Sequence, residues 1–177
     1  MVAFDYETTG LKPHAIGHRI VCCAVAYDEN RAYAFMMPKS KRATQPFIDL
    51  LANPYIAKMA HNMKFEETWS VVRLRQPVVN WGWDSMQAAH VIDNRTGVTG
   101  LKFQTYVNFG VVDYASEVAP YLRAKDNNGN AINRIMELVE MPGGKEKLLE
   151  YCGLDAIYEF RLAMIQQKVM NYSFLPF

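Results

Sequence analysis

Near its N-terminus the chain reads Phe4-Asp5-Tyr6-Glu7-Thr8-Thr9-Gly10, in which apolar and acidic residues alternate before a turn. The alternation predicts a strand over residues 2–7. Asp5 and Glu7 then project from one face, roughly 6 to 7 Å apart, and two carboxylates placed so in a mostly apolar strand repel each other. A surface strand accounts for one such acid. The pair, at a strand end, is better explained by bound divalent cations.

The composition is that of a compact globular protein. The chain has 177 residues, of which 50% are hydrophobic, and this length suits one domain with a sizeable core. Nineteen basic and eighteen acidic residues nearly cancel, so a groove for nucleic acid would have to be a local feature of the surface. We therefore expect a single domain over residues 1–177.

The cysteines and the hydropathy pattern indicate a reducing, aqueous compartment. Cys22 and Cys23 are adjacent and Cys152 stands apart, without the spacing of a zinc site, so we interpret all three as reduced core residues. No stretch approaches the roughly 18 apolar residues of a membrane span, and the N-terminus lacks a charged and apolar leader. We expect a cytoplasmic protein, or one of the host cytoplasm if its source is viral, without a membrane partner.

Periodicity predicts an α/β fold, with a mixed β-sheet of about five strands flanked by helices. Beyond the first strand, we expect strands over residues 19–27, 31–37, 56–60 and 78–83. We expect a helix over residues 44–51, with Thr44 as its cap and Pro46 in its first turn, and another over 84–92, with Asp84 as its cap. A further helix contains Phe65 and ends before Pro77. The last two helices are expected over residues 101–109 and 145–171. The polar segment 123–144 breaks this pattern and is interpreted as a mobile region.

Two more polar clusters follow the first along the chain. Asn62 and Glu66 lie four residues apart where a strand passes into a helix, so both can face the same sheet edge. Tyr151 and Asp155 share one face of the last helix, with side-chain bases roughly 6 Å apart. Each residue also has an ordinary explanation. Helix starts favour acids, an Asp can border an amphipathic helix, and a tyrosine can fill a core with its hydroxyl in water.

Together, Asp5-x-Glu7, Asn62-x-x-x-Glu66 and Tyr151-x-x-x-Asp155 resemble the three motifs of the DEDD superfamily of 3′–5′ exonucleases, whose fold is RNase H-like. The tyrosine four residues before the last acid is similar to the tyrosine (DEDDy) branch, since the histidine branch has its residue five before. Segments 83–90 and 100–103 also resemble parts of the proofreading exonuclease domains of family-A DNA polymerases. The resemblance covers nearly the whole chain.

This resemblance implies a two-metal phosphodiesterase site. The implied catalytic residues are Asp5, Glu7, Glu66, Tyr151 and Asp155, and the four acids among them would hold two divalent cations, Mg²⁺ or Mn²⁺. Asp5 would bridge both cations, and Glu66 would help the second through water. Tyr151 would orient the attacking water, because a phenol with an ordinary pKa near 10 is a poor base.

The implied substrate is DNA with a single-stranded 3′ end, shortened to nucleoside 5′-monophosphates in a reaction of the proofreading type in DNA replication. Thr8 would meet the terminal nucleotide through its backbone, Leu11 would wedge against the last bases, and Asn62 would hydrogen-bond the strand. Leu11 as a plain loop anchor is an alternative. A DNA polymerase would be a partner in trans. Two other functions stay open: an RNase D-like exoribonuclease, and an inactive nucleic-acid-binding module.

One position departs from the family pattern. The middle motif usually ends in Asp, whereas this chain has Glu66, a side chain one methylene longer that can still reach a cation directly or through water. Asp84 and Asp93 are alternative fourth carboxylates, although each is explained by its place at a helix end. Glu67, about a quarter-turn from Glu66, is interpreted as surface decoration.

Overall fold

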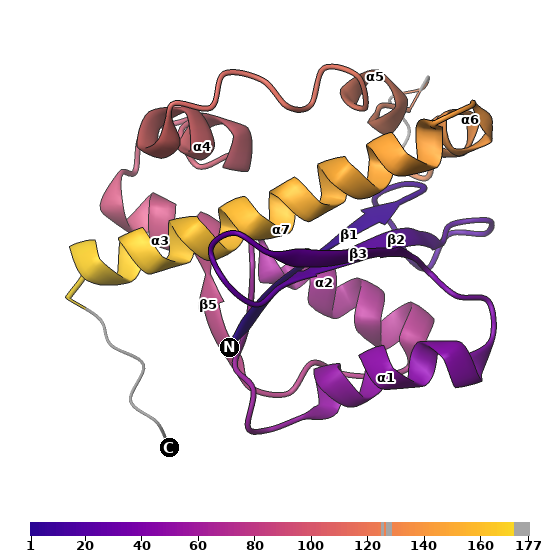
Figure 1. Cartoon of the computed structure of the whole chain (residues 1–177), viewed down its shortest axis with the longest axis horizontal. Helices are drawn as coiled ribbons and strands as arrows, with labels where there is room; N and C mark the ends of the chain where they lie inside the picture. Colours follow the sequence, from indigo (N-terminus) through magenta and orange to yellow (C-terminus); the bar gives the residue numbers. More distant parts are fainter. Residues whose placement is uncertain (125, 127–128, 172–177) are drawn as a thin grey trace.

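The computed structural model describes residues 1–124, 126 and 129–171, and its centre is a five-stranded sheet with the order β3-β2-β1-β4-β5 (Figure 1). The strands are β1 (Val2–Thr8), β2 (Ile20–Ala26), β3 (Ala32–Met36), β4 (Lys58–Ala60) and β5 (Trp81–Asp84). Strands β1, β2 and β3 pair antiparallel, whereas β4 is parallel to both β1 and β5. The predicted mixed sheet is confirmed, with β1 at its centre.

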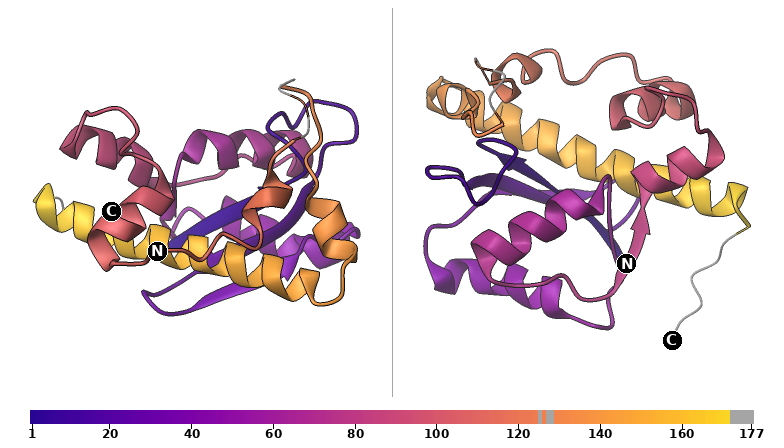
Figure 2. Two further views of the ribbon diagram at one scale, coloured as in Figure 1. Left: turned by 90° about the horizontal axis from the view of Figure 1, so that it is seen from above. Right: turned by 180° about the vertical axis from the view of Figure 1, so that it is seen from behind.

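Helices cover both faces of this sheet (Figure 1, Figure 2). The helices are α1 (Lys41–Ala52), α2 (Met63–Trp69) with a π-helical continuation (Ser70–Leu74), α3 (Ser85–Ile92), α4 (Leu101–Phe109), α5 (Ala119–Leu122), α6 (Ile135–Glu140) and α7 (Gly144–Val169). Helix α7 crosses one face, with α3, α4 and α6 packed along it, and α1 and α2 lie on the other. None of the helices in the described residues is long and apolar enough to cross a membrane.

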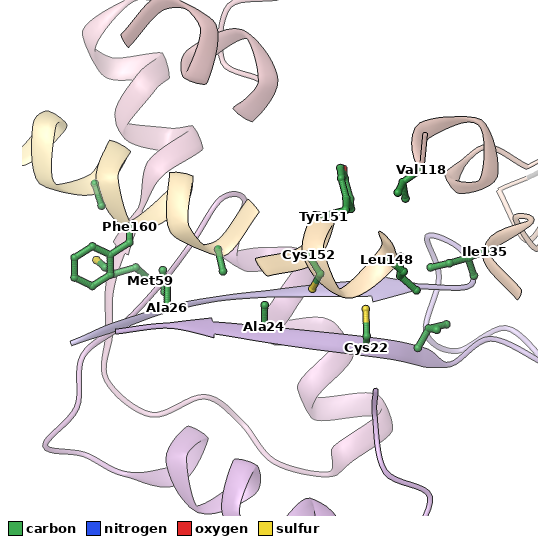
Figure 3. Packing of buried hydrophobic residues seen from close by; sticks show 14 of the residues in the cluster. Cys22, Ala24, Ala26, Met59, Val118, Ile135, Leu148, Tyr151, Cys152 and Phe160 are labelled. Carbon is green, nitrogen blue, oxygen red and sulfur yellow. The ribbon is translucent and has the colours of Figure 1, made fainter. Parts of the chain in front are cut away.

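The alternation along β1 divides the core in two. Phe4 and Tyr6 point to the α1 and α2 side, where their rings lie 6.0 and 5.9 Å from that of Phe47. On the α7 side the sheet offers small residues, such as Ala24, so α7 can approach closely (Figure 3). Asp5 belongs to this second face of β1, directly under α7.

Several predicted boundaries hold and others shift. The helix over 101–109 and the Asp84 cap are confirmed. Helix α1 starts earlier than predicted, because the Ser40 hydroxyl accepts the Ala43 N–H at 3.2 Å and acts as its cap. Pro46 consequently lies in the second turn, not the first, on the exposed side where water can reach the carbonyl it leaves unpaired.

The segment 123–144 is more structured than its composition indicates. It contains α6 and a β-bridge between Ala124 and Asn133, and the preceding α5 has no clear sequence signal. The side-chain and backbone nitrogens of Asn133 donate to the carbonyls of Thr8 and Thr9, both at 2.9 Å, so this segment is fastened to the end of β1. Residues 125, 127 and 128 of the predicted mobile region lie outside the described residues.

Gly144 opens α7 where no side chain fits. A Cβ there would lie 1.8 Å from the carbonyl oxygen of Leu138 in α6. We expect Gly144→Ala to destabilise the protein by about 1–3 kcal/mol, because an overpacked site has to shift its backbone. Thermal unfolding measures the loss. Gly153→Ala on the same helix is the control, since its Cβ would be in ordinary contact with the Ala34 side chain, at 3.8 Å. Equal losses in both variants would contradict this account.

Candidate active site

Three carboxylates meet where β1 lies against α7. Asp5, Glu7 and Asp155 each offer an oxygen, and these oxygens lie within 4.8 Å of one another. The side chains of Glu7 and Asp155 are buried, and the Cys152 thiol donates a weak hydrogen bond to Asp5 at 3.6 Å. Hard oxygen ligands at this separation suit a divalent cation such as Mg²⁺. The first and third predicted motifs are therefore brought together.

Tyr151 projects from the same side of α7 as Asp155, one turn earlier. Its phenol is buried at 7% exposure, and burial, followed by the charges of Asp155, Glu7 and Asp5, raises its pKa far above the ordinary value of 10. The hydroxyl therefore keeps its proton at neutral pH. It can donate a hydrogen bond beside the three carboxylates.

The middle motif lies next to Asp5 but outside this compact group, which has three members among the described residues. Asn62 precedes α2 with a φ of 78°, a left-handed conformation that Asn tolerates. Glu66 is 2% exposed, and its Oε2 has no hydrogen-bond partner. Burial and then the charge of Asp5 raise the pKa of Glu66. An unpartnered buried carboxylate of this kind requires an offsetting charge or a proton.

Asp84 has a structural task instead. Its carboxylate accepts the backbone N–H groups of Met86 and Gln87 at 2.9 and 3.1 Å, as the predicted cap of α3. It also accepts those of Asn62 and Met63 at 3.1 and 3.0 Å. One side chain thus ties the start of α2 to the start of α3, and its lone pairs are engaged in both.

Glu67 was wrongly predicted to be surface decoration. Its Oε2 accepts the Val78 backbone N–H at 3.1 Å and the Trp81 indole N–H at 2.9 Å. Asp93 is paired with exposed Arg95, at 2.6 Å, and lies at the end of α3 as predicted.

Three residues of the site escaped the sequence analysis. Lys102 forms an ion pair with Asp155, and the Tyr114 hydroxyl donates to the same Asp155 oxygen at 2.5 Å. Glu159 is 2% exposed, one turn after Asp155, and burial raises the pKa of its carboxyl group. The four-residue spacing from Asp155 is a signal that pointed to Glu159. Lys102 and Tyr114 reach the site only through tertiary packing.

A cavity of about 560 Å³ opens beside the acids. Glu7, Thr8 and Leu11 line it together with Phe65 and Arg123, among others. Leu11 is 75% exposed, so its side chain is free to meet a ligand. Two of the three predicted substrate contacts, Thr8 and Leu11, thus line this cavity, whereas Asn62 does not.

A family model described as 3′–5′ exonuclease matches residues 1–171. The chain belongs to this 3′–5′ exonuclease family. It is a DEDD-superfamily member with the tyrosine form of the third motif, as the sequence predicts, and the family uses divalent metals. None of the curated proteins matches the sequence significantly.

Solved structures establish the RNase H-like fold of this exonuclease. Brucella melitensis NrnC with bound Mg²⁺ has a TM-score of 0.67 at 19% identity, over 96% of this chain and 73% of its own. The POL domain of Pol1 from M. smegmatis, in complex with DNA primer-template and dNTP, has a TM-score of 0.64 at 11% identity over 96% and 24%. Escherichia coli RNase D, an exoribonuclease involved in structured RNA processing, has a TM-score of 0.63 at 14% identity over 96% and 40%.

Because burial raises the pKa values of acids in the site, we expect the metal-free protein to lose stability as the pH rises. Burial, and then the charge of Asp155, raises the pKa of Asp5 from 3.8 to about 7. The unfolded chain therefore ionises first, so stability is full below the ordinary value of 3.8 and falls as the pH passes through about 7. Denaturation in EDTA at pH 5 and pH 8 measures this. Asp5→Asn should flatten the decline, and a wild type equally stable at both values would contradict it.

Proposed function

We propose that this exonuclease hydrolyses single-stranded DNA from the 3′ end, releasing nucleoside 5′-monophosphates, and that residues 1–177 form a single domain. The observation that carries the proposal is the compact group of Asp5, Glu7 and Asp155 with the Tyr151 hydroxyl beside it. Phosphodiester hydrolysis needs charge neutralisation, an activated water and a stabilised leaving oxygen. The residues of this group match those requirements in a chain of the 3′–5′ exonuclease family.

The acids fit two divalent cations, Mg²⁺ or Mn²⁺. Their oxygens lie within 4.8 Å of one another, and buried carboxylates at that spacing demand positive charge. Asp5, Glu7 and Asp155 would hold the cations, with Asp5 shared between them, and Glu66 would help the second through water. Bound cations would supply Lewis acidity at the phosphate and at the water.

Tyr151 positions the attacking water by hydrogen bonding. Its raised pKa keeps the phenol protonated, so it donates a hydrogen bond and does not take the proton from the water. Asp155 lies one turn further along α7, and Glu7 on β1 lines the cavity, so the reaction would take place at the Glu7 side of the cavity. The residues of this chain would thus catalyse the reaction mainly by positioning charges and the attacking water.

The substrate strand would enter through the 560 Å³ cavity. Leu11 would wedge against the last bases. Phe65, which also lines the cavity, offers an aromatic ring on which any base can stack. The Thr8 backbone would meet the terminal nucleotide, and Asn62 at the α2 start would hydrogen-bond the strand. Arg123, which also lines the cavity, would add positive charge for the phosphates of the strand.

RNA is the second candidate substrate. RNase D is an exoribonuclease, and NrnC has been solved bound to pGG, with folds similar to this one. In favour of DNA, segments 83–90 and 100–103 resemble those of DNA polymerase proofreading domains, and a DNA polymerase acting in trans would then be the partner.

Digestion of matched substrates tests the proposal. A 5′-labelled DNA with a 3′ overhang and an RNA of the same sequence are incubated with Mg²⁺, Mn²⁺ or EDTA. We expect stepwise shortening of the DNA that requires metal and disappears in Asp5→Asn, because the shared ligand is lost. Preferential shortening of RNA would replace the DNA proposal with the RNase D-like activity, since the site would then accept a 2′-hydroxyl. A folded wild type that cleaves neither would leave a binding module.

Glu66 provides a sharper test of the second cation. Glu66→Gln keeps the size of the side chain and removes the charge, so we expect activity to fall by roughly 10–100-fold, as is usual when a supporting ligand is lost. Glu150→Gln is the control, because Glu150 is exposed on α7 beside Tyr151. Initial rates at several Mg²⁺ concentrations separate weaker metal binding from slower chemistry. Equal activity of the two variants would remove Glu66 from the site.

A further inference from the structure

A lysine ammonium lies among the acids of the site. Lys102 Nζ forms an ion pair with the Oδ1 atom of Asp155, and it donates a hydrogen bond to the Tyr114 hydroxyl at 3.0 Å. The Asp155 side chain is 8% exposed, whereas that of Lys102 is 41% exposed, so the lysine enters the site from the solvent side. This ion pair occupies one oxygen of a carboxylate that the proposed function assigns to the metal.

Two aromatic rings hold the ammonium in place. Nζ lies 4.2 Å from the centre of the Tyr114 ring and 4.3 Å from that of the Tyr151 ring. Ring faces attract cations, and the effect grows where water is excluded. The Tyr114 hydroxyl also donates to Asp155 Oδ1 at 2.5 Å. Lysine, tyrosines and carboxylate therefore form one closed set of contacts, unlike a loose surface ion pair.

Packing against α7 fixes this arrangement. Lys102 lies in the first turn of α4, and Tyr114 follows α4 in the connection to α5. The Phe109 and Tyr114 rings pack against Tyr158 of α7, with centroids 6.0 and 5.0 Å away. The packing of α4 against α7 thus places Lys102 next to Asp155. The positive charge of Lys102 also lowers the pKa of Asp5, which burial raises.

We infer that Lys102 is a positioning residue that occupies the place of a cation on Asp155 in the metal-free protein and is displaced when a divalent metal binds. The inference rests on the proposed function, since Asp155 is a metal ligand only there. Before metal arrives, the lysine keeps the carboxylate oriented and offsets part of the negative charge. By this inference metal binding breaks the ion pair, so Lys102 weakens metal affinity while it stabilises the metal-free site.

Lys102→Met tests this, because methionine keeps an apolar stem of similar length and removes the charge. We expect Mg²⁺ to bind roughly 10-fold more tightly in calorimetric titration, since a charge-assisted hydrogen bond no longer competes. In EDTA the same variant should unfold at a lower temperature. Lys147→Met is the matched control, because Lys147 pairs with Glu117 in an exposed ion pair at 3.0 Å. It should leave Mg²⁺ affinity unchanged.

The outcomes separate this inference from the proposed function. If wild type binds Mg²⁺ and Lys102→Met binds it equally or more weakly, displacement is overturned and the exonuclease proposal stands. If wild type binds neither Mg²⁺ nor Mn²⁺, both fail. Should Lys102→Met not fold, Tyr114→Phe replaces it, because loss of that hydroxyl loosens both Lys102 and Asp155 without removing a charge. A smaller gain in Mg²⁺ affinity is then expected, and no gain would overturn the displacement.

Discussion

Repulsion among buried carboxylates is the constraint on which this structure depends. Asp5, Glu7 and Asp155 present oxygens within 4.8 Å of one another, and Glu66 and Glu159 lie within electrostatic reach of Asp5. A fold that buries such charge has to supply cations or protons. In this structure Lys102 pairs with Asp155, and burial raises the pKa values of Asp5 and Glu7.

The rest of the fold holds these acids against their repulsion. The α7 face of the sheet is lined by small residues, which allow α7 to lie close to β1 (Figure 3). Asp84 holds the second motif in place, because its carboxylate accepts backbone N–H groups at the starts of α2 and α3. The aromatic cluster around Phe4 on the opposite face gives β1 a rigid backing. These contacts thus stabilise the fold around the site, where repulsion between the carboxylates destabilises it.

The sequence was informative where function follows from local periodicity. Alternation in β1 places Asp5 and Glu7 on one face, and the four-residue helical spacing pairs Tyr151 with Asp155, so the fold class and the compact acid group could be predicted. Partners that come from distant segments could not. Lys102 approaches Asp155 across 53 residues of sequence, and no pattern around it distinguishes it from a solvated lysine.

Contacts between distant segments of the chain also explain the residues that were predicted wrongly or missed. Glu67 looked like an ordinary acid of a first helical turn, because nothing in its neighbourhood reveals that the Val78 amide and the Trp81 indole need an acceptor. Glu159 was missed although its four-residue spacing from Asp155 places it on the same side of α7, because an acid there also fits the exposed side of an amphipathic helix. Buried polar residues are the part of a site that a one-dimensional pattern describes least.

Metal binding and proton release are coupled in such a cluster. Burial raises the pKa of Asp5 to about 7, and it raises those of Glu7, Glu66 and Glu159 as well, so part of the negative charge is held as carboxylic acid near neutral pH. Divalent cations bind carboxylates and not carboxylic acids, so a cation that bound here would release protons and, by our inference, displace Lys102. Protons, the lysine and metal ions would thus compete for the carboxylates of this cluster. The same competitors would stabilise the site before metals bind, because protons and Lys102 offset the repulsion between the acids and keep their side chains oriented.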